Sequence, residues 1–272
     1  MDMLGLTSRW VAAVRERESL RSDRLFEDPW AGLLAGADGR ALMHWMEAQI
    51  PQPVPGDSPV LTERTRYFDD WMRAAAASGV RQFVILAAGM DTRAYRLDWP
   101  AGTRVYELDQ PAVLDCKAEL LRQAGAQPRA ERHALAVDLR DGFAEALQGA
   151  GYRPEQPSAW LIEGLLIYLP DAASALALLA RVATLSCAGS HLALDIAGSG
   201  LAGLTALQSV QERLRAGGAE WRFGCDDPDA LLAQAGYSVE ASAQAGQIGY
   251  RPGGQVLPAR VSYRLLRARR RG

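Results

Sequence analysis

Five apolar segments alternate with helix-like segments between residues 81 and 198, and this alternation limits the fold more than any other feature. The apolar segments cover residues 81–89, 103–111, 132–139, 158–169 and 191–198. Because their apolar runs are continuous, they are typical of strands buried on both faces of a parallel sheet. Two further strands, 237–243 and 259–269, have no long helix between them, so we expect an antiparallel pair at one edge.

Helical segments fill most of the remaining chain. Residues 1–57 predict a helical region that ends in a loop with four prolines between Ile50 and Pro59. A further helix starts near Ser58, which can cap it, and Pro59, which suits a first turn. The other helices are expected at 112–124, 141–147, 170–185, 202–215 and 227–235.

Composition excludes several classes of function. The net charge is −2 and the isoelectric point is about 6.0, so the chain has no general attraction for nucleic acid. The one basic run, Arg267 to Arg271, is expected to be a solvated tail. Three scattered cysteines and three distant histidines offer no metal cluster and favour a reducing compartment. The N-terminus lacks a signal core and no run of 18 apolar residues occurs, so we expect a soluble cytoplasmic protein without membrane contact.

The helix after Pro59 carries two arginines that are not equivalent. Arg64 lies on the apolar stripe with Leu61 and Phe68, whereas Arg66 lies on another face with Asp70. Arg66 is therefore expected to be a surface charge. Arg64 faces the protein body and needs an anionic partner, either a structural carboxylate or the carboxylate of a ligand.

Carboxylates follow every strand of the predicted parallel sheet, where ligands of such folds bind. The residues are Asp91, Glu107 with Asp109, Asp138, Glu163 and Asp195. Asp109 has the position that binds ribose hydroxyls, and Asp138 either receives an amine or caps a helix. Glu163 is surrounded by apolar residues and needs a cation or donors, which a ligand or a buried salt bridge could supply. Asp195 is expected to be a turn or cap residue. Glu107, Asp109, Asp138 and Glu163 are expected to form an acidic rim.

The segments "FVILAAGMDTRAYRL", "VYELDQP", "AVDLRD", "LIEGLLIYL" and "ERTRYFDDW" resemble the leucine carboxyl methyltransferase family over about residues 5–200. These are class I S-adenosylmethionine (SAM)-dependent methyltransferases, including bacterial enzymes that O-methylate natural products. The resemblance implies a Rossmann-like α/β fold: a mostly parallel seven-stranded sheet with an antiparallel last strand, helices on both faces and an N-terminal helical lid. It also implies one domain, divided into the lid (1–57), a SAM-binding core (58–200) and substrate-cap helices with C-terminal strands (201–272).

The resemblance assigns roles to individual residues. Arg64 would hold the cofactor's carboxylate, and the turn at Ala87 and Gly89 would pass beneath its methionine part. Glu163 would lie at the amino and sulfonium end. Arg9 is a loose match to a basic residue that touches the cofactor.

The resemblance implies three further contacts with the cofactor. Asp109 would bind the ribose, and Asp138 with the backbone of Leu139 would hold the adenine.

One residue departs from the family pattern. The family's turn usually reads Leu-Gly-Ala-Gly, and here Ala87 replaces the first glycine. A methyl group at this point limits φ and close backbone approach, so we expect weaker cofactor binding or a shifted turn.

The expected reaction is O-methylation of a small-molecule acceptor by a monomer or homodimer. A carboxylate, such as that of an aromatic polyketide acid, is ionised near pH 7 and needs no general base. Tyr168 and Arg222 are candidates for positioning the acceptor. A phenolic acceptor and a SAM-binding protein without turnover are the alternatives. A nicotinamide enzyme is disfavoured because Asp91 would repel a pyrophosphate.

Overall fold

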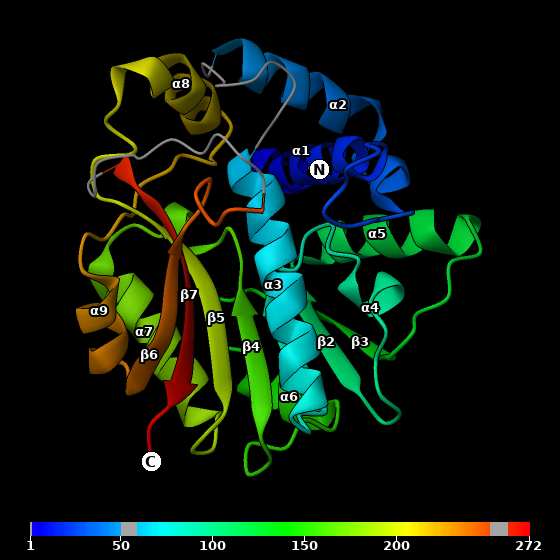
Figure 1. Cartoon of the computed structure of the whole chain (residues 1–272), viewed down its shortest axis with the longest axis vertical. Helices are drawn as coiled ribbons and strands as arrows, with labels where there is room; N and C mark the ends of the chain where they lie inside the picture. Colours follow the sequence, from blue (N-terminus) through cyan, green and yellow to red (C-terminus); the bar gives the residue numbers. More distant parts are fainter. Residues whose placement is uncertain (1, 50–58, 251–260) are drawn as a thin grey trace.

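The seven-stranded sheet has the order β3-β2-β1-β4-β5-β7-β6 (Figure 1). The computed structural model describes residues 2–49, 59–250 and 261–272. The strands are β1 (Gln82–Leu86), β2 (Arg104–Asp109), β3 (Glu131–Ala136), β4 (Ser158–Ile162), β5 (His191–Ala197), β6 (Tyr237–Gln244) and β7 (Tyr263–Arg270).

Strands β1 to β5 pair in parallel, and β7 pairs antiparallel with both β5 and β6. This confirms the expected mostly parallel sheet with an antiparallel last strand. The expectation of a basic solvated tail is wrong, because Arg267, Arg269 and Arg270 belong to β7. Arg269 pairs with Glu240 on β6, at 2.9 Å between Nε and Oε1.

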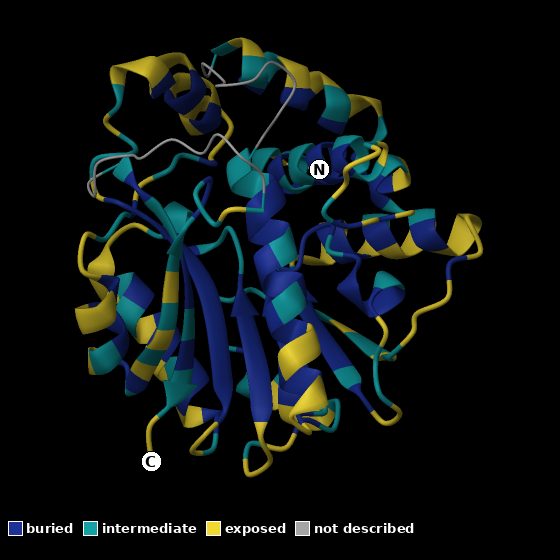
Figure 2. Ribbon diagram, viewed as in Figure 1, coloured by how far each residue is buried: buried dark blue, intermediate teal, exposed yellow. Residues whose placement is uncertain are grey.

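Helices cover both faces of the sheet, and alternation along the strands decides which face each residue reaches. Phe83 and Ile85 of β1 join one apolar cluster, which includes residues of α3 (Pro59–Ala77), α4 (Arg93–Arg96) and α5 (Pro111–Gln123). Val84 and Leu86 join the cluster on the opposite face. That cluster includes residues of α6 (Ala144–Gly149), α7 (Ala172–Thr184) and α9 (Pro228–Gln234). The central strands are buried throughout, and exposed residues lie on the outer sides of the helices (Figure 2).

A third group of helices lies beyond the C-terminal ends of the parallel strands (Figure 1). It consists of α1 (Met3–Ser19), α2 (Ala31–Gln49) and α8 (Gln208–Ala216), with the short 3₁₀ helix η2 (Thr205–Leu207) before α8. Leu42 and Met46 of α2 pack in one cluster with Val210 and Leu214 of α8. Segments from the beginning and the end of the chain therefore pack together above the sheet. The predicted cap residue Ser58 lies outside the described residues.

Element boundaries differ from expectation at three points near the strand ends. Strand β3 ends at Ala136, so Asp138 lies in the following turn. Strand β5 continues to Ala197, so Asp195 is a buried strand residue and the expectation of a turn or cap is wrong. The four-residue helix α4 was not expected, because it is shorter than the helical period can reveal.

The turn after β1 is held in left-handed backbone conformations. Ala87 has φ +52°, the only positive φ of a non-glycine residue in the described ranges, and Gly89 has φ +48°. A Cβ on Gly89 would lie 2.7 Å from the Cβ of Ser8 in α1, so a side chain does not fit there. The turn thus forms with alanine in place of the family's first glycine, at a cost of about 1–2 kcal/mol for the left-handed alanine.

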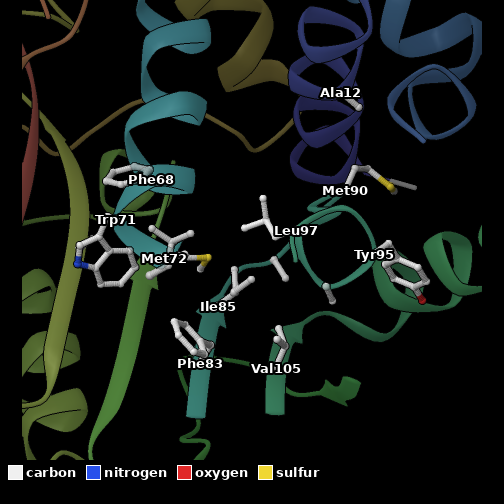
Figure 3. Packing of buried hydrophobic residues seen from close by; sticks show 14 of the residues in the cluster. Ala12, Phe68, Trp71, Met72, Phe83, Ile85, Met90, Tyr95, Leu97 and Val105 are labelled. Atoms are coloured by element: carbon white, nitrogen blue, oxygen red, sulfur yellow. The ribbon is translucent and has the colours of Figure 1, made fainter. Parts of the chain in front are cut away.

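Strand β1 and helix α3 form the centre of the larger apolar cluster. Phe68, Trp71 and Met72 of α3 belong to the same cluster as Phe83 and Ile85, and Met72 points toward Ile85 (Figure 3). Phe83 is fully buried, and its ring lies 4.7 Å from that of Trp99, measured between centroids. This packing fixes α3, and hence Arg64, against the sheet.

Replacing Phe83→Ala should lower the free energy of unfolding by about 3–5 kcal/mol, because it leaves a cavity in a close-packed core. Leu20, with 82% of its surface exposed, is the matched control, and Leu20→Ala should change stability by less than about 0.5 kcal/mol. Urea denaturation of both variants measures the difference. Equal losses would contradict the assigned core.

Ala87→Gly should raise the free energy of unfolding by about 0.5–1 kcal/mol, because relief of the left-handed strain exceeds the added flexibility of the unfolded chain. Ala88 is buried beside it with an ordinary φ, so Ala88→Gly should lower stability by about 1 kcal/mol. Thermal and urea denaturation give both values. A destabilised Ala87→Gly variant would show that the turn is not strained by its alanine.

Candidate functional site

A cavity of about 1320 Å³ lies at the C-terminal ends of β1, β2, β3 and β4. Strand order reverses between β1 and β4, the usual ligand position in an open α/β sheet. Residues of α1 and of the first turns of α3 form one side of the cavity, and residues 201–207 and 221–222 contribute to another. The cavity is larger than the roughly 300–1,000 Å³ typical of a site for one small ligand.

Nine of the site residues expected from the sequence line this cavity. They are Arg64, Ala87, Gly89, Asp109, Asp138, Leu139, Glu163, Tyr168 and Arg222. These residues are spread over 159 positions of the chain, from 64 to 222, and the sheet brings them together.

Asp109 ends β2 and is tied to the glycine turn. Its carboxylate accepts a hydrogen bond from the Gly89 N–H at 2.6 Å and one from the Gln110 N–H at 2.7 Å. Burial raises the pKa of Asp109 above its ordinary value. No arginine or lysine of the described chain forms a salt bridge with it, so its remaining acceptor capacity faces the cavity. A pair of ribose hydroxyls is a suitable donor for such a carboxylate.

Arg64 of α3 is buried and reaches the ends of β4 and β5. Its Nη1 donates to Asp195 Oδ2 at 2.8 Å and to the Tyr263 hydroxyl at 3.0 Å. Its Nε lies 2.9 Å from Glu163 Oε1 and forms an ion pair with it, but the N–H does not point at this oxygen, so no hydrogen bond forms. Nη2 has no partner in the described part of the chain. Structural carboxylates therefore hold this guanidinium and leave one nitrogen available. The sequence predicts either a structural carboxylate or a ligand carboxylate as the partner of Arg64, and the guanidinium has room for both.

Arg66 of the same helix is part of the surface, as expected. Its Nε donates to Asp70 Oδ2 at 2.7 Å, and Asp70 also accepts a hydrogen bond from Arg73 at 3.1 Å. Burial thus separates two arginines that are only two positions apart in sequence.

Glu163 directly follows β4 and is part of a buried salt bridge. Its Oε2 accepts a hydrogen bond from Arg93 Nη1 at 2.7 Å, while Oε1 lies beside Arg64. Arg93 also binds Asp91, and its Nε donates to Asp69 Oδ1 at 2.8 Å. The charge of Glu163 is therefore neutralised within the protein, while the side chain still lines the cavity.

The ion pairs continue from the strand ends to α1. Arg96 of α4 donates to Asp69, and Thr92 donates to Asp28 Oδ2 at 2.6 Å. Arg15 of α1 donates to the same oxygen at 2.9 Å and to the Met90 carbonyl at 2.5 Å. Sequence reasoning missed three of these arginines. Arg93 and Arg96 stand three positions apart just after the glycine turn, a spacing that could have indicated them, whereas Arg15 lies in an ordinary charged helix.

Asp138 and Leu139 form the cavity wall beyond β3. Asp138 accepts hydrogen bonds from the backbone and guanidinium of Arg140, and these lower its pKa to about 2. The Leu139 carbonyl accepts a hydrogen bond from Arg181 at 2.7 Å. The Leu139 N–H has no partner among the described residues and is available to a ligand.

Three residues from the sequence reasoning do not line the cavity: Glu107, Arg9 and the buried Asp195. Glu107 is fully buried against Lys117 and Arg132, at 2.6 and 2.7 Å, so its place in the predicted acidic rim is wrong. It fails because Glu107 lies two residues before the end of β2, where Lys117 of α5 and Arg132 of β3 enclose its carboxylate. Arg9 donates to Cys116 Sγ at 3.0 Å and does not line the cavity, so its loose match to a cofactor residue is not supported.

Tyr168 and Arg222 both line the cavity and belong to segments that are joined by a backbone hydrogen bond. Tyr168 belongs to the 3₁₀ helix η1 (Leu166–Tyr168), and its hydroxyl donates to Thr7 Oγ1 of α1 at 3.3 Å. Burial raises the pKa of Tyr168, so its hydroxyl is a donor at neutral pH. Arg222 has a half-exposed side chain near Glu220, and its backbone N–H donates to the Ile167 carbonyl at 2.7 Å.

No helix in the described ranges is long and apolar enough to cross a membrane. No group of three or more histidine, cysteine, aspartate or glutamate side chains in these ranges is arranged to hold a metal ion.

Comparison with solved structures gives the same fold. A methyltransferase-like protein from Thermobifida fusca superimposes with a TM-score of 0.67 at 17% identity, covering 96% of this chain and 94% of that one. A DUF574 family protein from Streptomyces avermitilis gives 0.64 at 16% identity, covering 94% and 99%. At these identities the likeness concerns the fold alone.

Sequence relatives are closer. A protein from Saccharopolyspora erythraea named "Putative S-adenosyl-L-methionine-dependent methyltransferase" is 43% identical over 255 residues, which is 87% of this chain and 84% of that protein. A relative from Mycolicibacterium smegmatis with the same kind of name is 47% identical over 201 residues, covering 71% and 66%. The family model for leucine carboxyl methyltransferase matches residues 8–183. The chain therefore belongs to the leucine carboxyl methyltransferase family.

Proposed function

We propose that this chain transfers the methyl group of SAM to an oxygen atom of a small-molecule acceptor, most favourably a carboxylate. Family membership makes it a SAM-dependent methyltransferase. The observation that carries the proposal is that three groups able to bind a ligand line one cavity. They are the Asp109 carboxylate, which forms no salt bridge within the described chain, the Leu139 N–H and Nη2 of Arg64. A second cavity, of about 520 Å³, is lined by none of these three residues.

The cavity residues fit SAM group by group. Asp109 would accept the ribose hydroxyls, and Asp138 with the Leu139 backbone would hold the adenine. Arg64 would bind the cofactor's carboxylate through Nη2, beside Glu163 at the amino end. The arginines near the glycine turn already have partners in the protein, since Arg15 is bound to Asp28 and Arg93 to Asp91 and Glu163. When bound, SAM supplies an already activated methyl group, so the protein's task is to position the acceptor and exclude water.

A carboxylate acceptor is favoured because no described histidine lines the cavity, and the carboxylates of Asp91, Asp138 and Glu163 are paired with arginines. None of the three histidines, all of which are in the described ranges, lines it. Tyr168 keeps its proton at neutral pH, so it can donate a hydrogen bond to an acceptor oxygen but cannot remove a proton. An ionised carboxylate needs no such step. Leu165, Ile167, Leu204 and Trp221 give this side of the cavity an apolar wall, which would desolvate the attacking oxygen.

Two alternatives remain distinct from this proposal. A phenolic hydroxyl could be the acceptor if a cation such as Arg222 lowered its pKa, since that side chain lines the cavity. A SAM-binding protein without turnover would need the same cofactor contacts but no acceptor space. The volume of about 1320 Å³ argues against that second alternative.

Arg64→Ala should weaken SAM binding by about 100-fold, because it removes a buried charged donor to the cofactor's carboxylate. Arg66→Ala should change it by less than about 2-fold, because that side chain is a surface charge. Isothermal titration calorimetry with SAM measures both, and thermal melts establish that each variant is folded. Equal effects in two folded variants would contradict the assigned role of Arg64.

Incubation with SAM and a mixed pool of aromatic acids and phenols should yield a product that is heavier by one methyl group, detected by mass spectrometry. Mild base should remove that methyl, because it hydrolyses an ester and leaves an aryl ether intact. The same pool without protein is the control. A base-stable product would favour the phenolic alternative, and SAM binding without any product over a broad pool would favour the binding protein.

A further inference from the structure

Asp195 and Tyr263 surround the inner end of Arg64, and no expected role accounts for either. Asp195 Oδ2 accepts hydrogen bonds from Arg64 Nη1 at 2.8 Å and from the Tyr263 hydroxyl. Its Oδ1 accepts the Gly164 N–H at 2.7 Å. The Asp195 side chain is almost completely buried, whereas Tyr263 lines the cavity.

We propose that Asp195 and Tyr263 are positioning residues that orient Arg64 toward the carboxylate of SAM. The inference rests on the proposed role of Arg64 in SAM binding. Both partners bond the same nitrogen, Nη1, so the plane of the guanidinium is set and Nη2 is left for a ligand. A guanidinium held by only one partner would rotate about that contact, whereas two partners fix it.

The same carboxylate also positions the other end of the cofactor's amino-acid group. Gly164 directly follows Glu163 and has φ +66°, and Asp195 holds its N–H. A Cβ on Gly164 would lie 3.4 Å from Arg64 Nη1, so the glycine lets the guanidinium pack close to the backbone. Asp195 thus sets the relative placement of Arg64 and Glu163, the two side chains proposed to meet the carboxylate and amine of SAM.

Tyr263→Phe tests the proposal because it removes the hydroxyl and keeps the ring. We expect SAM affinity, measured by calorimetry, to fall about 10-fold, as for loss of a hydrogen bond to a charged group. Affinity for decarboxylated SAM, which lacks the group that Arg64 is proposed to bind, should change by less than about 2-fold. Both ligands are titrated into the same preparation, so a partly unfolded sample cannot produce this difference.

The double-mutant cycle with Arg64→Lys asks whether Tyr263 acts through Arg64. In the Arg64→Lys background, Tyr263→Phe should alter SAM affinity by less than about 2-fold, because lysine lacks the guanidinium that Tyr263 is proposed to orient. Tyr237→Phe is the matched control: Tyr237 is a buried tyrosine on the neighbouring strand β6 that does not line the cavity, and its loss should leave both affinities unchanged.

Equal losses for SAM and decarboxylated SAM, or the same loss in both Arg64 backgrounds, would overturn the proposal. Wild-type protein that fails to bind SAM would overturn it together with the proposed function. SAM binding with the expected ligand difference but no methylated product would remove only the proposed function. The two failures are therefore distinguishable.

Discussion

The site depends on the compensation of four buried arginines by carboxylates from separate elements. Arg15, Arg64, Arg93 and Arg96 come from α1, α3 and α4, and their partners come from the chain around Asp28, from α3 and from the ends of the strands. A buried guanidinium without an anion is very unfavourable, so each element can occupy its place only when the others are present. The helices above the sheet and the strand ends below them are in this way fixed as one unit around the cavity.

Much of the architecture follows from short-range patterns in the sequence. Continuous apolar runs predict the buried parallel strands, and the helical stripe of α3 separates Arg64 from Arg66. These features depend on local periodicity, which one sequence displays. Ion pairing between distant residues does not show in a single sequence. Arg64 and Asp195 are 131 positions apart, and the sequence around one residue does not indicate that it pairs with the other. The misassignment of Glu107 has the same origin, because its partner Lys117 lies on the following helix.

The turn after β1 forms with an alanine at a position where the family usually has glycine. The sequence predicts weaker cofactor binding or a shifted turn here. In the structure Ala87 adopts φ +52°, and Asp109 at the end of β2 accepts a hydrogen bond from the Gly89 N–H. Gly89 has no such freedom, because Ser8 of α1 occupies the space where its side chain would be. The turn therefore tolerates a methyl group at one position, where only the backbone angle resists it, and excludes one where a helix packs against it.

The placement of β7 has a consequence for folding kinetics. β6 pairs only with β7, which lies between β6 and β5, so β6 cannot join the sheet before β7 is in place. Tyr263, at the start of β7, meets Arg64 across a sequence separation of 199 residues. Closing so long a loop is entropically costly and slow. The corner of the cavity around Arg64 is thus among the late-forming parts of the molecule, so an intermediate with most of the sheet assembled would still lack it.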